Sequence, residues 1–148
     1  MRIFGTRWFE KVKDGGPDSP VDAYFLCEIK GLFSIAILKF NKGCREEYHT
    51  HAFGALTWFI KGSLVEEFWV RPSRWYTRSW LPKFTSRHKL HRVNAKEDSW
   101  CFTIRGPWSE TWMEWNSKTN TKTLLTHGRK VVKSGPIYDL GDRDEVTK

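Results

Sequence analysis

The sequence predicts an all-β fold, an antiparallel β-barrel or sandwich, on three observations. Segments rich in β-branched and aromatic residues recur at a spacing of roughly 8–12 residues and are separated by turn-forming residues. None of these segments shows the apolar period of an amphipathic helix. Aromatic residues make up 16% of the 148 residues, and nine of them are tryptophan. Such large rings fill a small core with few side chains, which suits a single domain of this length.

The elements follow a polar N-terminal segment that ends in a loop at 14–20, where Gly, Pro and Asp gather. Tight turns are expected at Gly31 and Gly62, each between two apolar runs. One domain spans 1–148, with its core at about 23–127 and peripheral segments at 1–20 and 128–148. The expected strands are 24–30, 32–40, 55–61, 63–69, 85–93, 100–105, 110–115 and 121–126.

Membrane and secretory signals are missing from the sequence. Its longest apolar runs are only a few residues, as at 35–38, whereas a transmembrane helix needs roughly 20. No apolar stretch follows the first residues, so a signal peptide is not indicated. The three cysteines, Cys27, Cys44 and Cys101, form neither a CxxC pair nor a disulfide framework. We therefore expect a cytoplasmic protein that does not contact membranes.

Basic residues exceed acidic ones by 25 to 17, which gives a formal charge of +8 and favours anionic partners. No acidic residue lies between Glu67 and Glu97, and aromatic rings are interleaved with the basic residues there. Such a stretch can pair with phosphates and stack on bases, or can simply be a solvated basic face. We expect a small anionic ligand, with single-stranded nucleic acid as a less favoured partner. The candidate ligand-binding residues are Arg71, Arg74, Arg78, Arg87 and Arg92, with Trp58 and Trp80 as stacking walls.

Common catalytic motifs are also missing. The sequence contains no GxGxxG, GxxxxGK[ST] or GxSxG, which removes support for dinucleotide-binding, P-loop and serine-hydrolase activities. Several glutamates could supply a base near a metal ion. Glu66 and Glu67 are adjacent, so only one of them can face the interior, and the sequence does not decide which.

His49 and His51 form the sharpest local feature. On a strand, residues two apart point to the same face, so both imidazoles can converge on one metal ion. A third ligand must come from elsewhere, and His91 and His88 are the candidates. The alternative is a pair of surface or core histidines that bind no metal.

The surroundings of these histidines resemble the cupin family. Its first motif contains a Gly, an HxH pair, a Glu and a second Gly, and its second motif supplies a further His that is often followed by Asn. The resemblance spans about 30–126, and the stretch 100–108 with Trp112 is similar to small bacterial and phage-encoded cupins. It implies a cupin-type antiparallel β-barrel or jelly roll. The matching residues are Gly43, His49, His51 and Gly62 for the first motif and His91 and Asn94, with Pro82 upstream, for the second.

One departure from the family pattern concerns the metal ligands. The family Glu should lie seven residues before Gly62, where this sequence has Ala55. The remaining set of His49, His51 and His91 is similar to the three-His site of the thiol dioxygenase branch of cupins. That resemblance implies a metal-dependent, dioxygenase-like enzyme that acts on a small anionic substrate. Fe(II) is the first choice of metal, and Zn, Mn or Ni also fit.

Metal-free cupins that only bind ligands exist as well. The alternative is therefore a non-catalytic protein that captures an anionic, nucleotide-like ligand through an Arg/Trp-rich pocket.

Strand parity extends the prediction around the histidines. If His49 and His51 face inward, then 53, 55, 57 and 59 share that face, and Thr57 and His88 are expected just outside the ligands. The opposite parity set of Leu56, Trp58 and Ile60 is equally apolar, so the outer face also needs cover. Either the N-terminal segment or a second subunit could supply that cover, and the second alternative predicts a homodimer.

Overall fold

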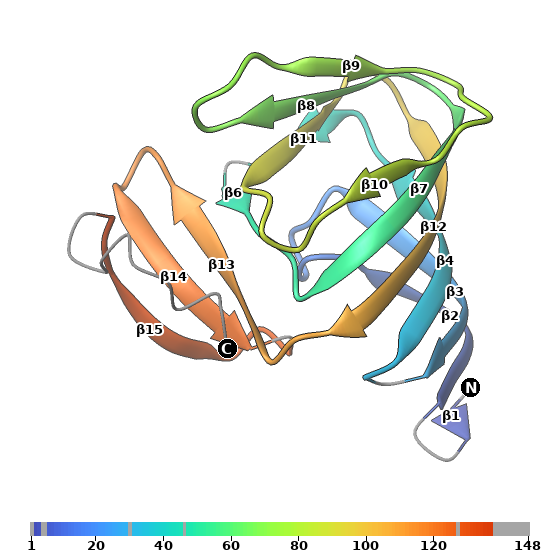
Figure 1. Cartoon of the computed structure of the whole chain (residues 1–148), viewed down its shortest axis with the longest axis horizontal. Coiled ribbons are helices and arrows are strands. Elements are labelled where there is room, and N and C mark those ends of the chain that lie inside the picture. The colour runs from blue at the N-terminus through green and yellow to red at the C-terminus, as the bar shows by residue number, and fades with distance from the viewer. Residues whose placement is uncertain (1, 4–5, 30, 46, 127, 138–148) are drawn as a thin grey trace.

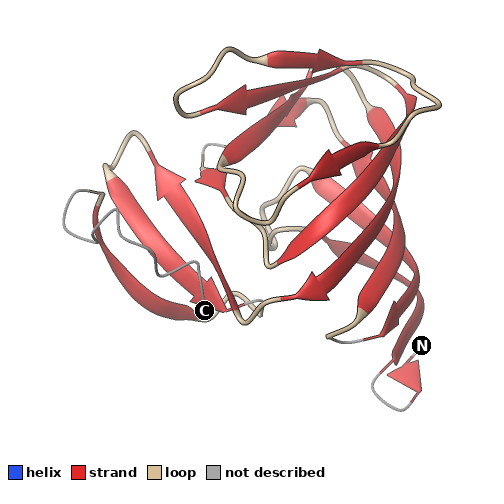
Figure 2. Cartoon of the chain, viewed as in Figure 1, coloured by secondary structure: helices blue, strands red, loops and turns tan. Residues whose placement is uncertain are grey.

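The computed structural model describes residues 2–3, 6–29, 31–45, 47–126 and 128–137. In these residues all regular structure is β-strand, arranged as two antiparallel sheets that face each other (Figures 1 and 2). No helix in the described ranges is long and apolar enough to cross a membrane. The predicted all-β class is therefore confirmed.

The first sheet contains seven strands in the spatial order β1-β2-β3-β4-β12-β7-β10. Its central ladder pairs β12 with both β4 and β7, which joins the middle of the chain to its later part. The strands are β1 (Arg2–Ile3), β2 (Thr6–Lys13), β3 (Val21–Ile29), β4 (Phe33–Phe40), β7 (Phe53–Lys61), β10 (Lys83–Thr85) and β12 (Ser99–Trp108).

The second sheet contains eight strands, in the order β15-β14-β13-β6-β11-β8-β9, with β5 also paired to β11. Figure 1 shows β13, β14 and β15 set at one side of the molecule, where the short β6 joins them to β11. The strands are β5 (Gly43–Cys44), β6 (Tyr48–His49), β8 (Leu64–Phe68), β9 (Arg74–Tyr76), β11 (His91–Ala95), β13 (Thr111–Asn116), β14 (Thr121–Thr126) and β15 (Val131–Pro136).

The two sheets form an open barrel. Each ladder among the described residues joins strands of the same sheet, so the barrel is not closed by backbone hydrogen bonds. The inner face of the first sheet carries small, fully buried residues such as Ala23, Ala36, Cys101 and Thr103. Ala23 and Ala36 belong to the packed core, whereas a cavity remains between the sheets where short side chains such as Ala55, Cys101 and Thr103 line it.

Strand parity along β7 agrees with the prediction. Ala55 and Thr57 line the interior with Phe53 and Phe59, whereas Leu56 and Ile60 are 39% and 47% exposed on the outer face. Leu56 lies beside Ile104 and Phe84 on the neighbouring strands, so the outer face of this sheet is apolar over several strands. The homodimer expected from this face stays a prediction.

The two predicted glycine turns play different roles. Gly31 lies in the turn of the β3–β4 hairpin, with φ of +84°. Gly62, with φ of +94°, lies at a corner where the chain leaves β7 in the first sheet and enters β8 in the second. Positive φ values favour glycine, which explains both residues.

One strand prediction differs from the structure. The expected strand at 85–93 is wrong in its middle, because β10 ends at Thr85, residues 86–90 form a turn, and β11 begins at His91. The turn is held by the amide of Lys89, which donates to the carbonyl oxygen of Ser86 at 3.2 Å. Within the segments expected to be peripheral, 6–13 and 131–136 form strands at or next to a sheet edge. Residues 138–148 of the predicted C-terminal segment lie outside the described residues.

Candidate metal centre

Three histidines meet on the inner face of the second sheet. His49 on β6 and His91 on β11 are cross-strand partners, and His51 follows two residues after His49. One nitrogen from each imidazole lies within 4.8 Å of the other two, and Nε2 of His51 lies 2.7 Å from Nε2 of His91. The sequence-predicted ligand set is therefore brought together as a group that could hold a metal ion.

The backbone between His49 and His51 is fixed from two sides. The amide of Thr50 donates to the carbonyl oxygen of Met113 at 2.9 Å, and the Met113 amide donates back to Oγ1 of Thr50 at 2.9 Å. The amide of His51 donates to the carbonyl oxygen of Arg87 at 3.0 Å. Thr50 is only 5% exposed, so this anchor is buried and holds both imidazoles in place.

The carboxylate of Glu66 orients His91. Glu66 on β8 is 1% exposed and accepts a hydrogen bond from Nδ1 of His91. The same carboxylate accepts from the Tyr76 hydroxyl at 2.9 Å and lies 2.7 Å from Nζ of Lys83. Since Nδ1 of His91 carries the proton, its Nε2 presents a lone pair toward His51, as a metal ligand must. The donor set therefore fits a transition metal ion.

Electrostatics keep these groups in the state that a metal ion requires. Burial, together with the neighbouring positive groups, holds the pKa of His49 and His51 well below the ordinary value. Burial also lowers the pKa of His91, although Glu66 opposes this effect. Burial alone would raise the pKa of Glu66, but His91 and Lys83 bring it down to about 2. At neutral pH the site therefore holds neutral imidazoles and one ionised carboxylate.

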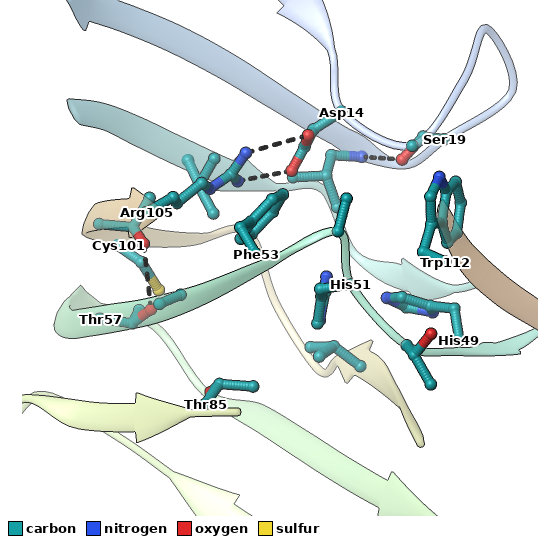
Figure 3. A pocket seen from close by; sticks show the side chains of 18 of the residues that line it. Asp14, Ser19, His49, His51, Phe53, Thr57, Thr85, Cys101, Arg105 and Trp112 are labelled. Atoms are coloured by element: carbon teal, nitrogen blue, oxygen red, sulfur yellow. Dashed lines mark hydrogen bonds and ion pairs between the residues drawn. The ribbon is translucent and has the colours of Figure 1, made fainter. Parts of the chain in front are cut away.

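The histidine cluster lines a cavity of about 890 Å³ between the sheets (Figure 3). Its wall next to the cluster is aromatic, because the Phe53 ring lies 5.3 Å from that of His51 and the Trp112 ring 6.4 Å from that of His49. The guanidinium of Arg105 lies over the Phe53 ring and that of Arg129 over the Trp112 ring, and Arg7 and Arg45 also line the cavity. The cavity therefore places aromatic rings and guanidinium groups beside the three histidines, together with acidic residues such as Asp14 and Glu66.

Arginines predicted to bind ligand lie elsewhere. None of Arg71, Arg74, Arg78, Arg87 and Arg92 is among the residues that line the cavity. The first three are exposed, and Arg92 donates from Nε to Glu67 at 2.7 Å on the outer side of β11. Their role in binding an anion stays a prediction for the outer surface.

The two predicted tryptophans and the two residues expected near the ligands are also placed. Trp58 packs against Phe102, with ring centroids 5.7 Å apart, and Trp80 is 84% exposed beside Arg78. His88 is exposed in the turn before β11 and lies outside the cavity. Thr57 does line the cavity, and its hydroxyl lies 3.2 Å from that of Thr103.

Sequence reasoning missed Arg45, Arg105 and Arg129, and it left Glu66 and Glu67 undecided. For Arg105 a signal existed, because Cys101, Thr103 and Arg105 alternate along one predicted strand and a buried Cys101 places all three inside. For Arg45 and Arg129 no comparable signal existed, because both lie in irregular segments.

Comparison with known proteins supports the architecture alone. No family model matches the sequence, and no curated protein matches it. Solved structures do match: an RmlC-like cupin from Shewanella frigidimarina has a TM-score of 0.51 at 16% identity, covering 67% of this chain and 84% of that one. Ectoine synthase from P. lautus gives 0.51 at 16% identity, with 65% and 70% covered. FeII HppE gives 0.53 at 10% identity, with 66% and 55% covered. With two facing antiparallel sheets around a histidine-lined cavity, the protein has the cupin fold.

Proposed function

We propose that this protein is a metal-dependent cupin enzyme with dioxygenase-like chemistry, acting on a small anionic substrate. The observation that carries the proposal is the convergence of His49, His51 and His91 within 4.8 Å at the wall of a large cavity. Three neutral imidazoles leave the full charge of a divalent ion uncompensated among the ligands, which favours an anionic ligand at the open positions.

Fe(II) is the first choice of metal, and Zn, Mn and Ni are the other candidates. Fe(II) is supported by the imidazole set and by the fold likeness to FeII HppE, an Fe(II)-containing protein. When bound, Fe(II) would supply the redox chemistry that couples an organic substrate to dioxygen.

The chain's own residues hold and line the site. Glu66 fixes the proton of His91 on Nδ1, and Thr50 fixes the backbone between the other two ligands. The Phe53 ring packs beside the imidazole of His51 and the Trp112 ring beside that of His49, so the cavity wall next to the ligands is apolar. Arg45 and Arg129 hold positive charge nearby, which attracts and orients an anion.

Metal analysis tests the proposal. Protein purified without chelators and reloaded anaerobically with Fe(II) should hold about one metal ion per chain. The variants His49→Ala, His51→Ala and His91→Ala should each retain less than about one-tenth of an equivalent, whereas His88→Ala, a change at an exposed histidine, should match the wild type. If the wild-type protein takes up no Fe(II), Zn(II), Mn(II) or Ni(II), the proposal of a metal-dependent enzyme is refuted.

Capture of an anionic ligand without catalysis is the second candidate. It is supported by the arginines in the aromatic wall, since the guanidinium of Arg129 lies 5.3 Å from the Trp112 ring. Trp58 and Trp80 do not line the cavity, so a nucleotide-like ligand held there would stack on Trp112 or Phe53 instead. A thermal-shift screen of nucleotides in EDTA separates the two functions, because capture should survive both EDTA and His49→Ala.

A further inference from the structure

Arg105 places a buried guanidinium in the cavity wall. The side chain is 4% exposed, and its Cζ lies 4.8 Å from the ring centroid of Phe53. On its other side Phe53 contacts His51, with the two ring centroids 5.3 Å apart. Phe53 therefore lies between the guanidinium of Arg105 and the histidine cluster (Figure 3). A buried guanidinium requires an anion beside it, because an unpaired buried charge is strongly destabilising.

Asp14 supplies that anion in a bidentate arrangement. Its Oδ1 accepts from Nη1 of Arg105 at 3.2 Å and its Oδ2 accepts from Nη2 at 2.6 Å. This parallel pairing is the geometry with which arginine recognises a free carboxylate. Asp14 begins the loop between β2 and β3, and its side chain is 32% exposed.

Two other arginines that line the cavity are paired differently. Arg45 and Arg129 both donate to Oε1 of Glu114, the latter at 3.0 Å. Glu114 belongs to β13, its side chain is 13% exposed, and it is paired through the backbone with His49. Glu114 is therefore a strand residue with a largely buried side chain, whereas Asp14 is a turn residue whose side chain is partly exposed.

Rotation of the Asp14 side chain can release Arg105 without moving the loop. The amide of Asp14 donates to the carbonyl oxygen of Val21 at 2.8 Å and closes the hairpin independently of the carboxylate. A turn of the side chain toward solvent would leave this bond intact.

We propose that Arg105 is the binding site for the carboxylate of a ligand, and that Asp14 occupies this site while the ligand is absent. The contacts through Phe53 place the guanidinium within about 10 Å of the His51 ring. A single small molecule can span that distance, so the ligand class is a short carboxylic acid with a second functional group near the histidines. The position of the second group near the histidines rests on the proposed function, whereas binding of the carboxylate by Arg105 does not depend on it.

Acetate is the probe, because it contains the carboxylate alone. Titrations use EDTA-treated protein at constant ionic strength, with sodium chloride replacing sodium acetate and ¹³C-acetate NMR as the readout. Asp14→Asn should bind acetate about tenfold more tightly than the wild type, since the internal competitor is removed. Arg105→Lys in the Asp14→Asn background should lose that gain. Glu67→Gln, which breaks the Arg92–Glu67 pair outside the cavity, is the matched control and should leave acetate affinity unchanged.

The proposal that Asp14 competes with a ligand for Arg105 is overturned if folded Asp14→Asn and the wild type bind acetate with equal affinity. If Asp14→Asn folds poorly, sodium acetate should raise its Tm more than sodium chloride does, and equal effects of the two salts overturn the proposal. Metal uptake is measured separately, on EDTA-free aliquots of the same preparations that are reloaded anaerobically with Fe(II). Acetate binding without metal uptake supports the carboxylate site and contradicts the proposed metal-dependent function, whereas metal uptake without an acetate response supports the metal-dependent function and contradicts the carboxylate site.

Discussion

His91 donates a hydrogen bond from Nδ1 to the buried carboxylate of Glu66, on the neighbouring strand β8. Glu66 lies opposite Val93, so it shares a face with His91, whereas the next residue, Glu67, points to the other face and pairs with Arg92. The carboxylate of the family pattern, missing at Ala55, is thus not replaced among the three candidate metal ligands. Glu66 instead supplies a carboxylate that hydrogen-bonds to one of them, His91.

Glu66→Gln should weaken metal binding by about 10–100-fold, because the amide no longer fixes the His91 tautomer or supplies a negative charge. The measurement is an anaerobic Fe(II) or Co(II) titration with folding checked by circular dichroism. Glu67→Gln is the control, since Glu67 lies on the opposite face of the same strand. Equal losses in both variants would show that Glu66 has no specific role.

Tyr76→Phe should lower the free energy of unfolding by about 1.5–3 kcal/mol, the loss of one hydrogen bond to a buried, ionised carboxylate. The ring should stay in place, because it stacks on Phe59 with centroids 4.9 Å apart. Burial and the Glu66 charge raise the pKa of Tyr76 to about 12, so the hydroxyl remains a donor throughout the accessible pH range. Urea unfolding at pH 7 and pH 9 should give the same difference from the wild type.

Cys101 should resist thiol reagents in the folded protein. It is 1% exposed, and burial raises the pKa of its thiol to about 12, so little thiolate forms even at pH 10. Iodoacetamide should modify the exposed Cys44 first and reach Cys101 only after unfolding.

The same thiol affects stability at high pH. The unfolded state loses its Cys101 proton near pH 9, well before the folded state does, so stability should fall as the pH rises above 9. The slope attributable to this group is at most about 1.4 kcal/mol per pH unit. Comparing wild type with Cys101→Ala between pH 8.5 and 10.5 isolates it, and identical slopes would contradict the assignment.

Gly62→Ala should destabilise the protein by about 3 kcal/mol or more. A Cβ there would lie 2.6 Å from Cα of Ser99, and the residue also has φ of +94°. Gly31→Ala is the matched control, because its φ is +84° but nothing lies within 4 Å of the added atom. The smaller loss at Gly31, about 1–2 kcal/mol, would measure the backbone strain alone. Thermal unfolding of the two variants should therefore separate strain from collision.

Local patterns predicted the parts of the fold and the site that depend on neighbours in sequence. The spacing of His49 and His51 placed two imidazoles on one face, and the alternation along β7 placed Ala55 and Thr57 inside with them. The third histidine followed from family resemblance, and the structure brings it to the cluster.

The charged residues show where sequence reasoning failed. The acid-free stretch concentrates arginines along the chain, but those at 71, 74 and 78 lie in or beside an edge strand and are exposed. Arg45, Arg105 and Arg129 are far apart in sequence, and only the packing of both sheets brings them to one cavity. A run of charge in the sequence reports local composition, whereas a charged cavity depends on tertiary contacts.

The short strand β6 has a consequence for how metal occupancy could be detected. Its two residues are the link between β13 and β11, and His49 on β6 is the cross-strand partner of His91 on β11. An ion bound by both histidines would cross-link β6 to β11, at the point where the second sheet is connected, among the described residues, only by the two residues of β6. The amides of β13–β15 should then exchange with deuterium more slowly in the loaded protein than in the stripped one, which gives a readout of metal binding before any substrate is known.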